Sequence, residues 1–221
     1  MKGAVLRLTE DRFGVNGRYG RLLPAVNRVL YLLRGELAVG SGGRVTQVRP
    51  NSAWHGVGEC PATASPDGAT VLRYELVRAG TPATSAPGVE SRLLLEHPIL
   101  LDPAEQYLMR CDRVDFELGG EALPHCHKGG GIRCLISGTL ELRVGDEPPR
   151  IVGAGQAWLE SGREPVYAAA SRDVPTSFIR CAILPRAIKG KSSIVYVNPT
   201  DATRGKPRQY TMLVDEPIEL P

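Results

Sequence analysis

The chain has 221 residues, enough for one large hydrophobic core or two smaller ones. Its 42% hydrophobic and 23% charged residues are ordinary for a globular protein, and a formal net charge of +3 is too small to indicate nucleic acid or an acidic membrane surface as a partner. No apolar run approaches the roughly 18 residues that cross a bilayer, so we expect no membrane span and, by default, a cytoplasmic location.

The local patterns along the chain favour β-structure. The 25 glycines and 18 prolines indicate many short elements joined by turns, and alternating runs such as residues 36–39 and 139–144 end in Gly-rich or Gly-Asp turns typical of hairpins. We therefore predict an all-β sandwich or barrel with little helix, the one modest helical candidate being Pro103 to Arg110. Five cysteines without a CxxC pair predict reduced thiols rather than a disulfide framework.

The chain also contains a long internal repeat. The segments that begin at Leu33 and at Ile136 share a pattern of glycine, apolar and polar residues. Three landmarks keep their order and spacing: Gly35 and Gly138, Trp54 and Trp158, Arg73 and Arg180. Because chance rarely aligns so many features, we interpret the chain as a duplicated β-domain.

The repeat suggests where the domains begin and end. The predicted parts are an N-terminal barrel over 1–88, a C-terminal barrel over 89–190 and an extension over 191–221. Residues 79–87, rich in Pro, Ala, Ser and Thr, are expected to form a surface linker between the halves. The extension contains two strand-like segments that could close an edge of either barrel or pair with a second subunit, which makes a homodimer possible.

His125 and His127 are the first candidates for a functional site. They are separated by one residue, and side chains at i and i+2 of a strand leave the same face, so both imidazoles can point at one spot. Two neutral imidazoles are a start to a transition-metal site. The alternative is a pair of barrel histidines that bond to backbone or carboxylate groups.

These residues resemble the first motif of the cupin superfamily, Gly-x5-His-x-His-x3or4-Glu-x6-Gly. Gly119, His125, His127 and Gly138 match it, and the second cupin motif is echoed by residues 155–162. With the repeat, the resemblance covers roughly residues 20 to 190. It implies a bicupin, that is, two tandem double-stranded β-helix barrels of the jelly-roll type.

The sequence departs from the cupin ligand set, which usually comprises the two motif-one histidines, a motif-one glutamate and a motif-two histidine. The glutamate position falls on Gly131 or Ile132, and the last histidine position falls on Pro165. In the first repeat, the positions of the two histidines fall on Leu22 and Pro24. That half can hold no metal in the family's way, and we expect it to be structural or a lid.

Glu160 is the first choice for the missing third ligand, although it could equally be a solvated turn residue. Two histidines and one carboxylate would leave open positions on Fe(II), so iron is the first expectation for the metal, followed by Zn, Mn or Ni. Arg133 could pair with a substrate carboxylate or lie on a surface or edge strand. Tyr167 shares strand parity with Pro165, and Glu160, Arg133 and Tyr167 are the candidate catalytic residues.

Two functions follow from the resemblance. The first is a metal-dependent bicupin enzyme that acts on a small organic molecule in the second barrel, with dioxygenase-type oxidation as the most frequent chemistry of the family. The second is a non-catalytic module that binds or senses a small ligand, with or without a structural metal. The loss of two of the four usual ligands supports the second hypothesis.

Overall fold

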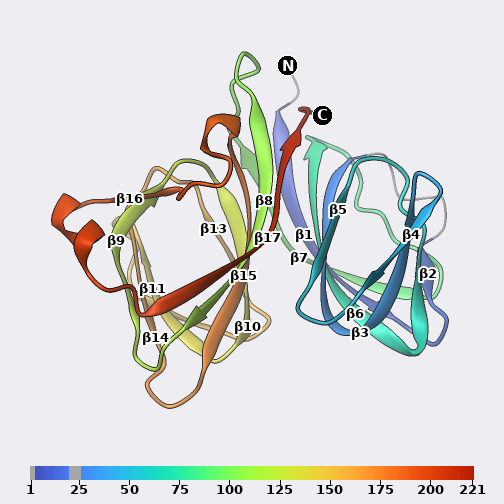
Figure 1. Cartoon of the computed structure of the whole chain (residues 1–221), viewed down its shortest axis with the longest axis horizontal. Coiled ribbons are helices and arrows are strands. Elements are labelled where there is room, and N and C mark those ends of the chain that lie inside the picture. Colours follow the sequence, from blue (N-terminus) through green and yellow to red (C-terminus); the bar gives the residue numbers. More distant parts are fainter. Residues whose placement is uncertain (1–2, 20–25) are drawn as a thin grey trace. The chain divides into compact units, whose positions relative to one another are not determined.

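The structure of the chain, a computed structural model, describes residues 3–19 and 26–221. It divides into two compact units, unit 1 up to Pro103 together with Ile218–Pro221, and unit 2 from Ala104 to Pro217. Both units consist of antiparallel strands (Figure 1). Helical structure in the described residues is limited to two 3₁₀ turns, η1 (Arg186–Ile188) and η2 (Pro199–Thr203). The prediction of an all-β fold with little helix is confirmed. No helix in these residues is long and apolar enough to cross a membrane.

Unit 1 forms one antiparallel sheet in the order β4-β3-β6-β1-β7, in which β2 also pairs with β6 and β5 with β3. The strands are β1 (Ala4–Phe13), β2 (Arg18–Tyr19), β3 (Asn27–Ser41), β4 (Arg44–Val48), β5 (Ala53–Gly56), β6 (Ala62–Arg78) and β7 (Val89–Ile99). The long strands β3 and β6 contain register shifts, which bend a strand and increase its twist. The apolar core lies among residues such as Leu30, Leu32, Trp54 and Val71.

Unit 2 has two sheets, β13-β10-β15-β8-β17 and β12-β11-β14-β9-β16. The strands are β8 (Tyr107–Phe116), β9 (Glu121–His127), β10 (Gly131–Ser137), β11 (Thr139–Val144), β12 (Arg150–Gly153), β13 (Ala157–Glu160), β14 (Val166–Ala170), β15 (Thr176–Pro185), β16 (Ile194–Tyr196) and β17 (Arg208–Ile218). Alternate residues of β14 and β13 are buried, and they contribute to a core that includes Leu135, Leu140 and Trp158. The site described below lies on this buried side.

The pairing of β7 places the division between the units later than the predicted boundary at residue 88. β7 pairs along its whole length with β1, so it completes the sheet of unit 1. The expected linker, residues 79–87, precedes β7 and is held to the same unit, because Arg7 and Arg73 donate hydrogen bonds to its carbonyl oxygens. It is a surface segment of unit 1 rather than a connection between the two units.

The C-terminal residues are likewise part of a barrel rather than a separate extension. β16 pairs with β9, and β17 occupies the edge of the other sheet beside β8. The predicted helix at 103–110 is wrong, because residues from Tyr107 onward form β8, which pairs with β15 over ten positions. The tertiary pairing of this segment outweighs its modest helical tendency.

The register of the two units matches the internal repeat. In unit 1, Leu30 lies between Trp54 on β5 and Arg73 on β6. In unit 2, Arg133 lies between Trp158 on β13 and Arg180 on β15. The landmark glycines play the same part in both units, since Gly35 and Gly138 both adopt positive φ. A Cβ on Gly35 would lie 2.1 Å from the carbonyl oxygen of Gly68, and one on Gly138 would lie 2.3 Å from Oγ1 of Thr176. The two units are therefore built to the same pattern.

Candidate functional site

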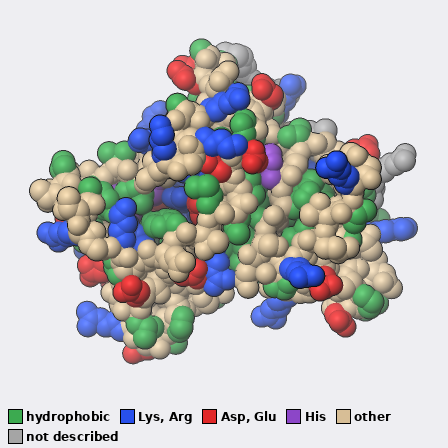
Figure 2. Space-filling model, in the orientation of Figure 1, with side chains coloured by type: hydrophobic (Ala, Val, Ile, Leu, Met, Phe, Trp, Pro, Cys, Tyr) green, Lys and Arg blue, Asp and Glu red, His purple; other side chains and the backbone are tan. Residues whose placement is uncertain are grey.

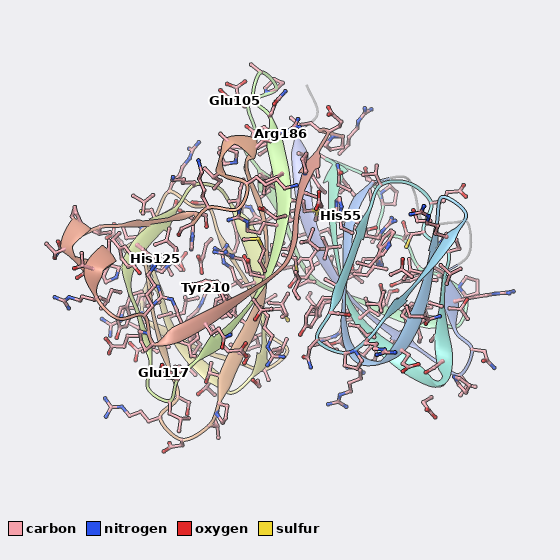
Figure 3. The ribbon with its side chains drawn as sticks, viewed as in Figure 1. His55, Glu105, Glu117, His125, Arg186 and Tyr210 are labelled. Carbon is pink, nitrogen blue, oxygen red and sulfur yellow. The ribbon has the colours of Figure 1, made fainter. Side chains whose placement is uncertain are left out.

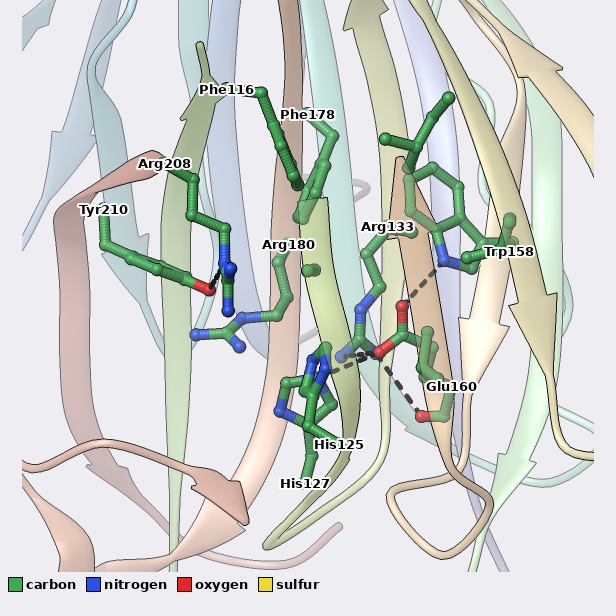
Figure 4. A pocket seen from close by; sticks show the side chains of 15 residues that line it. Phe116, His125, His127, Arg133, Trp158, Glu160, Phe178, Arg180, Arg208 and Tyr210 are labelled. Atoms are coloured by element: carbon green, nitrogen blue, oxygen red, sulfur yellow. Dashed lines mark hydrogen bonds and ion pairs between the residues drawn. The ribbon is translucent and has the colours of Figure 1, made fainter. Parts of the chain in front are cut away.

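A cavity in unit 2 brings together the two histidines and the acidic residue predicted from the sequence (Figure 4). His125 and His127 come from β9, Arg133 from β10 and Glu160 from β13. All four side chains are largely buried, which is unusual for ionisable groups and requires that they be paired. The cavity is small: the volume that the centre of a water molecule can occupy is about 20 Å³, which is room for about one water.

The two imidazoles are adjacent because they lie two residues apart on one strand. Their ring centroids are 4.8 Å apart with an interplanar angle of 86°. His125 contacts the carbonyl oxygen of Leu123 through Nδ1 at 2.7 Å, which fixes Nδ1 as the donor and leaves Nε2 as the acceptor nitrogen. His127 contacts Oε2 of Glu160 through Nε2 at 3.0 Å.

Glu160 is the centre of the polar cluster. Its Oε1 accepts a hydrogen bond of 2.9 Å from the indole nitrogen of Trp158, and its Oε2 lies 2.7 Å from Nη2 of Arg133. Nη1 of Arg133 donates to the carbonyl oxygen of Gly131 at 2.6 Å. Nη2 of Arg133 is close enough to Glu160 for an ion pair. Among the described residues, however, no acceptor has the alignment for a hydrogen bond with Nη2.

The surroundings determine which of these groups are charged. Burial lowers the pKa of His127 to about 3 against the opposing effect of Glu160, and burial also lowers the pKa of His125. Burial by itself would raise the pKa of Glu160, but Arg133 and His127 outweigh it and hold that pKa far below its ordinary value. Burial lowers the pKa of Arg133 to about 10. At neutral pH the cluster therefore holds neutral imidazoles, one carboxylate and one guanidinium.

The predicted metal can be tested against these groups. Both oxygens of Glu160 are engaged, and a buried guanidinium already lies against the carboxylate that a metal would need. Gly131, one of the two positions on which the motif glutamate falls, has no room for a side chain, because a Cβ there would lie 2.5 Å from the carbonyl oxygen of Cys181. The described residues contain no group of three or more His, Cys, Asp or Glu side chains that could hold a metal ion. The residues of this cavity do not fit a divalent metal.

Two further arginines, from β15 and β17, line the same cavity. Arg180 is paired with Asp112, to which its Nε donates at 3.0 Å. Arg208 is buried and donates to the hydroxyl of Tyr210 at 2.7 Å, the carbonyl oxygen of Glu121 at 3.0 Å and the hydroxyl of Tyr196 at 3.3 Å. All three acceptors are neutral, so Arg208 is a buried cation without a carboxylate partner in the described part of the chain.

A second and larger cavity adjoins the first, since Arg180 and Tyr210 line both. Measured in the same way, its volume is about 220 Å³, against about 20 Å³ for the first cavity. The residues that line it include Lys191, Ser193 and Lys206. Figure 3 shows His125 on β9 and Tyr210 on β17, strands that belong to the two different sheets of unit 2.

Ser193 lies between the two cavities. Its hydroxyl is 3.4 Å from Nδ1 of His127 and accepts a long hydrogen bond of 3.5 Å from Nη1 of Arg180. The sequence reasoning missed Ser193, Arg208 and Tyr210, because they belong to a segment that it treated as an extension. For Arg180 a signal existed, since the repeat singles it out together with Arg73.

Tyr167 is the one predicted site residue that the structure places elsewhere. On β14 the side chains of Val166 and Ala168 line the cavity, so Tyr167 between them points to the opposite face. There the guanidinium of Arg143 lies over its ring at 5.2 Å, beside a separate surface pocket. Tyr167 is therefore not part of the candidate site.

No protein-family model and no curated protein sequence matches the chain. Solved structures match its fold. AerE from Microcystis aeruginosa is 14% identical with a TM-score of 0.60, covering 82% of this chain and 88% of that chain. A salicylate 1,2-dioxygenase from Pseudaminobacter salicylatoxidans is 10% identical with a TM-score of 0.55, covering 80% of this chain and 70% of that one. An oxalate decarboxylase mutant from Bacillus subtilis is 14% identical with a TM-score of 0.56, covering 92% and 70%.

These neighbours are cupin-fold proteins, and the chain has the cupin fold, as the sequence resemblance implied. Identities of this size show the fold alone, and the activities of the neighbours are not thereby those of this chain.

Proposed function

We propose that the second barrel binds a small organic anion in its two adjoining cavities without the help of a metal ion. The observation that carries this proposal is Arg208, a buried guanidinium whose hydrogen bonds all go to neutral groups. A buried charge without a counter-charge is costly, and an anionic ligand would offset that cost.

The charges along the two cavities support an anion. Four arginines (Arg110, Arg133, Arg180 and Arg208) and two acidic residues (Glu160 and Asp112) line the two cavities, and Arg110 is paired with Asp215, which lines neither. Lys191 and Lys206 add positive charge at the larger cavity, and no ion pair involves either lysine in the described residues. By contrast Figure 2 shows Lys and Arg spread over the visible face among acidic and apolar side chains, which gives no sign of a broad basic surface.

The size of the larger cavity suits a small molecule, and its lining can recognise a carboxylate. Guanidinium, ammonium and hydroxyl groups are the usual donors to carboxylates in proteins. Ile194, Tyr210 and Met212 at the larger cavity offer apolar surface to the rest of the ligand. The names of three neighbouring structures mention salicylate, gentisate or oxalate, which are small organic acids and suit a first panel of ligands.

The dioxygenase activity predicted from the sequence depends on a metal, and we do not extend the proposal to it because the residues do not fit one. Binding without catalysis was the second sequence-based hypothesis, and the basic cavity supports the binding part of it.

The proposal is tested by calorimetric titration of chelator-treated protein with salicylate, gentisate, oxalate and short keto acids. We expect saturable binding of at least one of them, and Arg208→Gln should weaken it by about tenfold or more, as expected for loss of a charge-assisted hydrogen bond. Arg143→Gln, on the outer face of β11, is the matched control and should leave the affinity unchanged. Absence of binding by the whole panel, or equal affinity of Arg208→Gln and the parent, would refute the proposal.

A further inference from the structure

The two units differ at two equivalent positions in a way that links Arg133 to Glu160. Leu30 in unit 1 takes the register position of Arg133 in unit 2, beside the equivalent tryptophan. Gly56 takes the position of Glu160, two residues after that tryptophan. Unit 1 therefore lacks both members of this pair, and its own buried guanidinium on the equivalent strand, Arg28, pairs instead with Glu75 on β6. In each unit the buried guanidinium of this strand has a carboxylate partner.

The guanidinium of Arg133 lies where a cation would be needed. It is fully buried, is 2.7 Å from Glu160 and shares Oε2 of that carboxylate with His127. Carboxylate oxygen and imidazole nitrogen are common ligands of divalent transition metals. A second positive charge so close to a buried guanidinium would be repelled at a low effective dielectric.

We infer that Arg133 is a built-in cation that takes the place of a metal ion, and that its removal lets the side chains of His125, His127 and Glu160 rearrange into a divalent-metal site. The inference concerns the cation preference of the cluster alone. It stands or falls separately from anion binding in the adjoining cavity, which depends on Arg208.

The unit 1 sequence provides the substitution, since an apolar side chain already fills the same position there. Arg133→Leu removes the charge and keeps a residue that packs beside the equivalent tryptophan. Arg133→Lys keeps a positive charge of different shape. His127→Ala combined with Arg133→Leu removes one of the expected ligands.

The experiment is titration of chelator-treated protein with Co²⁺, followed by visible absorption of the bound ion and by elemental analysis after gel filtration. The parent and Arg133→Lys should retain no Co²⁺, Arg133→Leu should retain about one ion per chain, and the double variant should lose it. Circular dichroism and tryptophan fluorescence establish that each variant is folded. If Arg133→Leu does not fold, Arg133→Gln replaces it with the same expectation.

Three results would overturn the inference. The parent could bind one Co²⁺ with an absorption spectrum that His127→Ala abolishes. A folded Arg133→Leu or Arg133→Gln variant could retain no metal. The double variant could retain as much metal as Arg133→Leu, which would place the ion elsewhere.

Discussion

The ion pair between Arg133 and Glu160 makes a quantitative prediction about stability. Glu160→Gln removes the negative charge but keeps a side-chain oxygen that can accept from Trp158. Arg133 is then a buried cation without a counter-charge, because the carboxylate at 2.7 Å was its charged partner. Breaking one half of a buried pair typically costs about 3–5 kcal/mol, and we expect the free energy of unfolding of this barrel to fall by that amount.

The double variant Arg133→Leu/Glu160→Gln should be much less destabilised than the sum of the two single variants. It removes both charges and places at 133 the residue type that unit 1 has at the equivalent position. Replacement of a buried ion pair by apolar groups is often neutral or stabilising. We therefore expect a coupling energy of at least about 2 kcal/mol in the double-mutant cycle.

The assay is urea unfolding followed by tryptophan fluorescence in a Trp54→Phe background. The chain has two tryptophans, one in each unit, so Trp158 alone then reports on the second barrel. This matters because two units need not unfold as a single two-state system. A cost of Glu160→Gln below about 1 kcal/mol, or single-variant costs that simply add, would refute the reasoning about the pair.

Three further outcomes follow from the site and its scaffold. The pKa of His127 is lowered from 6.5 to about 3, so between these pH values the unfolded chain binds a proton that the folded chain does not. The free energy of unfolding should therefore fall with decreasing pH by up to about 1.4 kcal/mol per pH unit. Urea unfolding from pH 7 to 4 measures this dependence, and His127→Gln should lack the part that His127 contributes. Gly131→Ala should lower the thermal midpoint by several degrees, since its Cβ would lie 2.5 Å from the carbonyl oxygen of Cys181, and an unchanged calorimetric midpoint would contradict that contact. Tyr167→Phe should leave the affinity for the anion unchanged in the calorimetric titration. A clear loss of affinity would show that Tyr167 belongs to the binding site.

The fold could be predicted from the sequence because its signals are local and occur twice. Glycines with positive φ at Gly35 and Gly138 and the two tryptophans mark equivalent points of two β-barrels, and the structure keeps that equivalence in its register. The spacing of His125 and His127 likewise places both on one face of a strand. These features depend on residues close together in the sequence.

The remaining features depend on pairings that spacing alone does not show. The pairing of β7 with β1 moves the boundary of unit 1, and β17 brings Arg208 to a cavity from the far end of the chain. Tyr167 does share the face of Pro165, but that is the outer face, because Pro165 is exposed while Val166 and Ala168 line the cavity. The equivalents of the histidines in the first repeat, Leu22 and Pro24, lie outside the described residues.

The central claim, that the second barrel receives a small organic anion without a metal, is tested most directly by a fluorescence titration of Trp158 in the Trp54→Phe variant, with the acid panel and excess EDTA. Trp158 lines the same small cavity as Arg208 and donates to Glu160, so an anion held at the Arg208 guanidinium should change the electric field at the indole and its emission. We predict a saturable change with at least one acid that EDTA does not alter. A response that appears only after a divalent metal is added back would contradict the account.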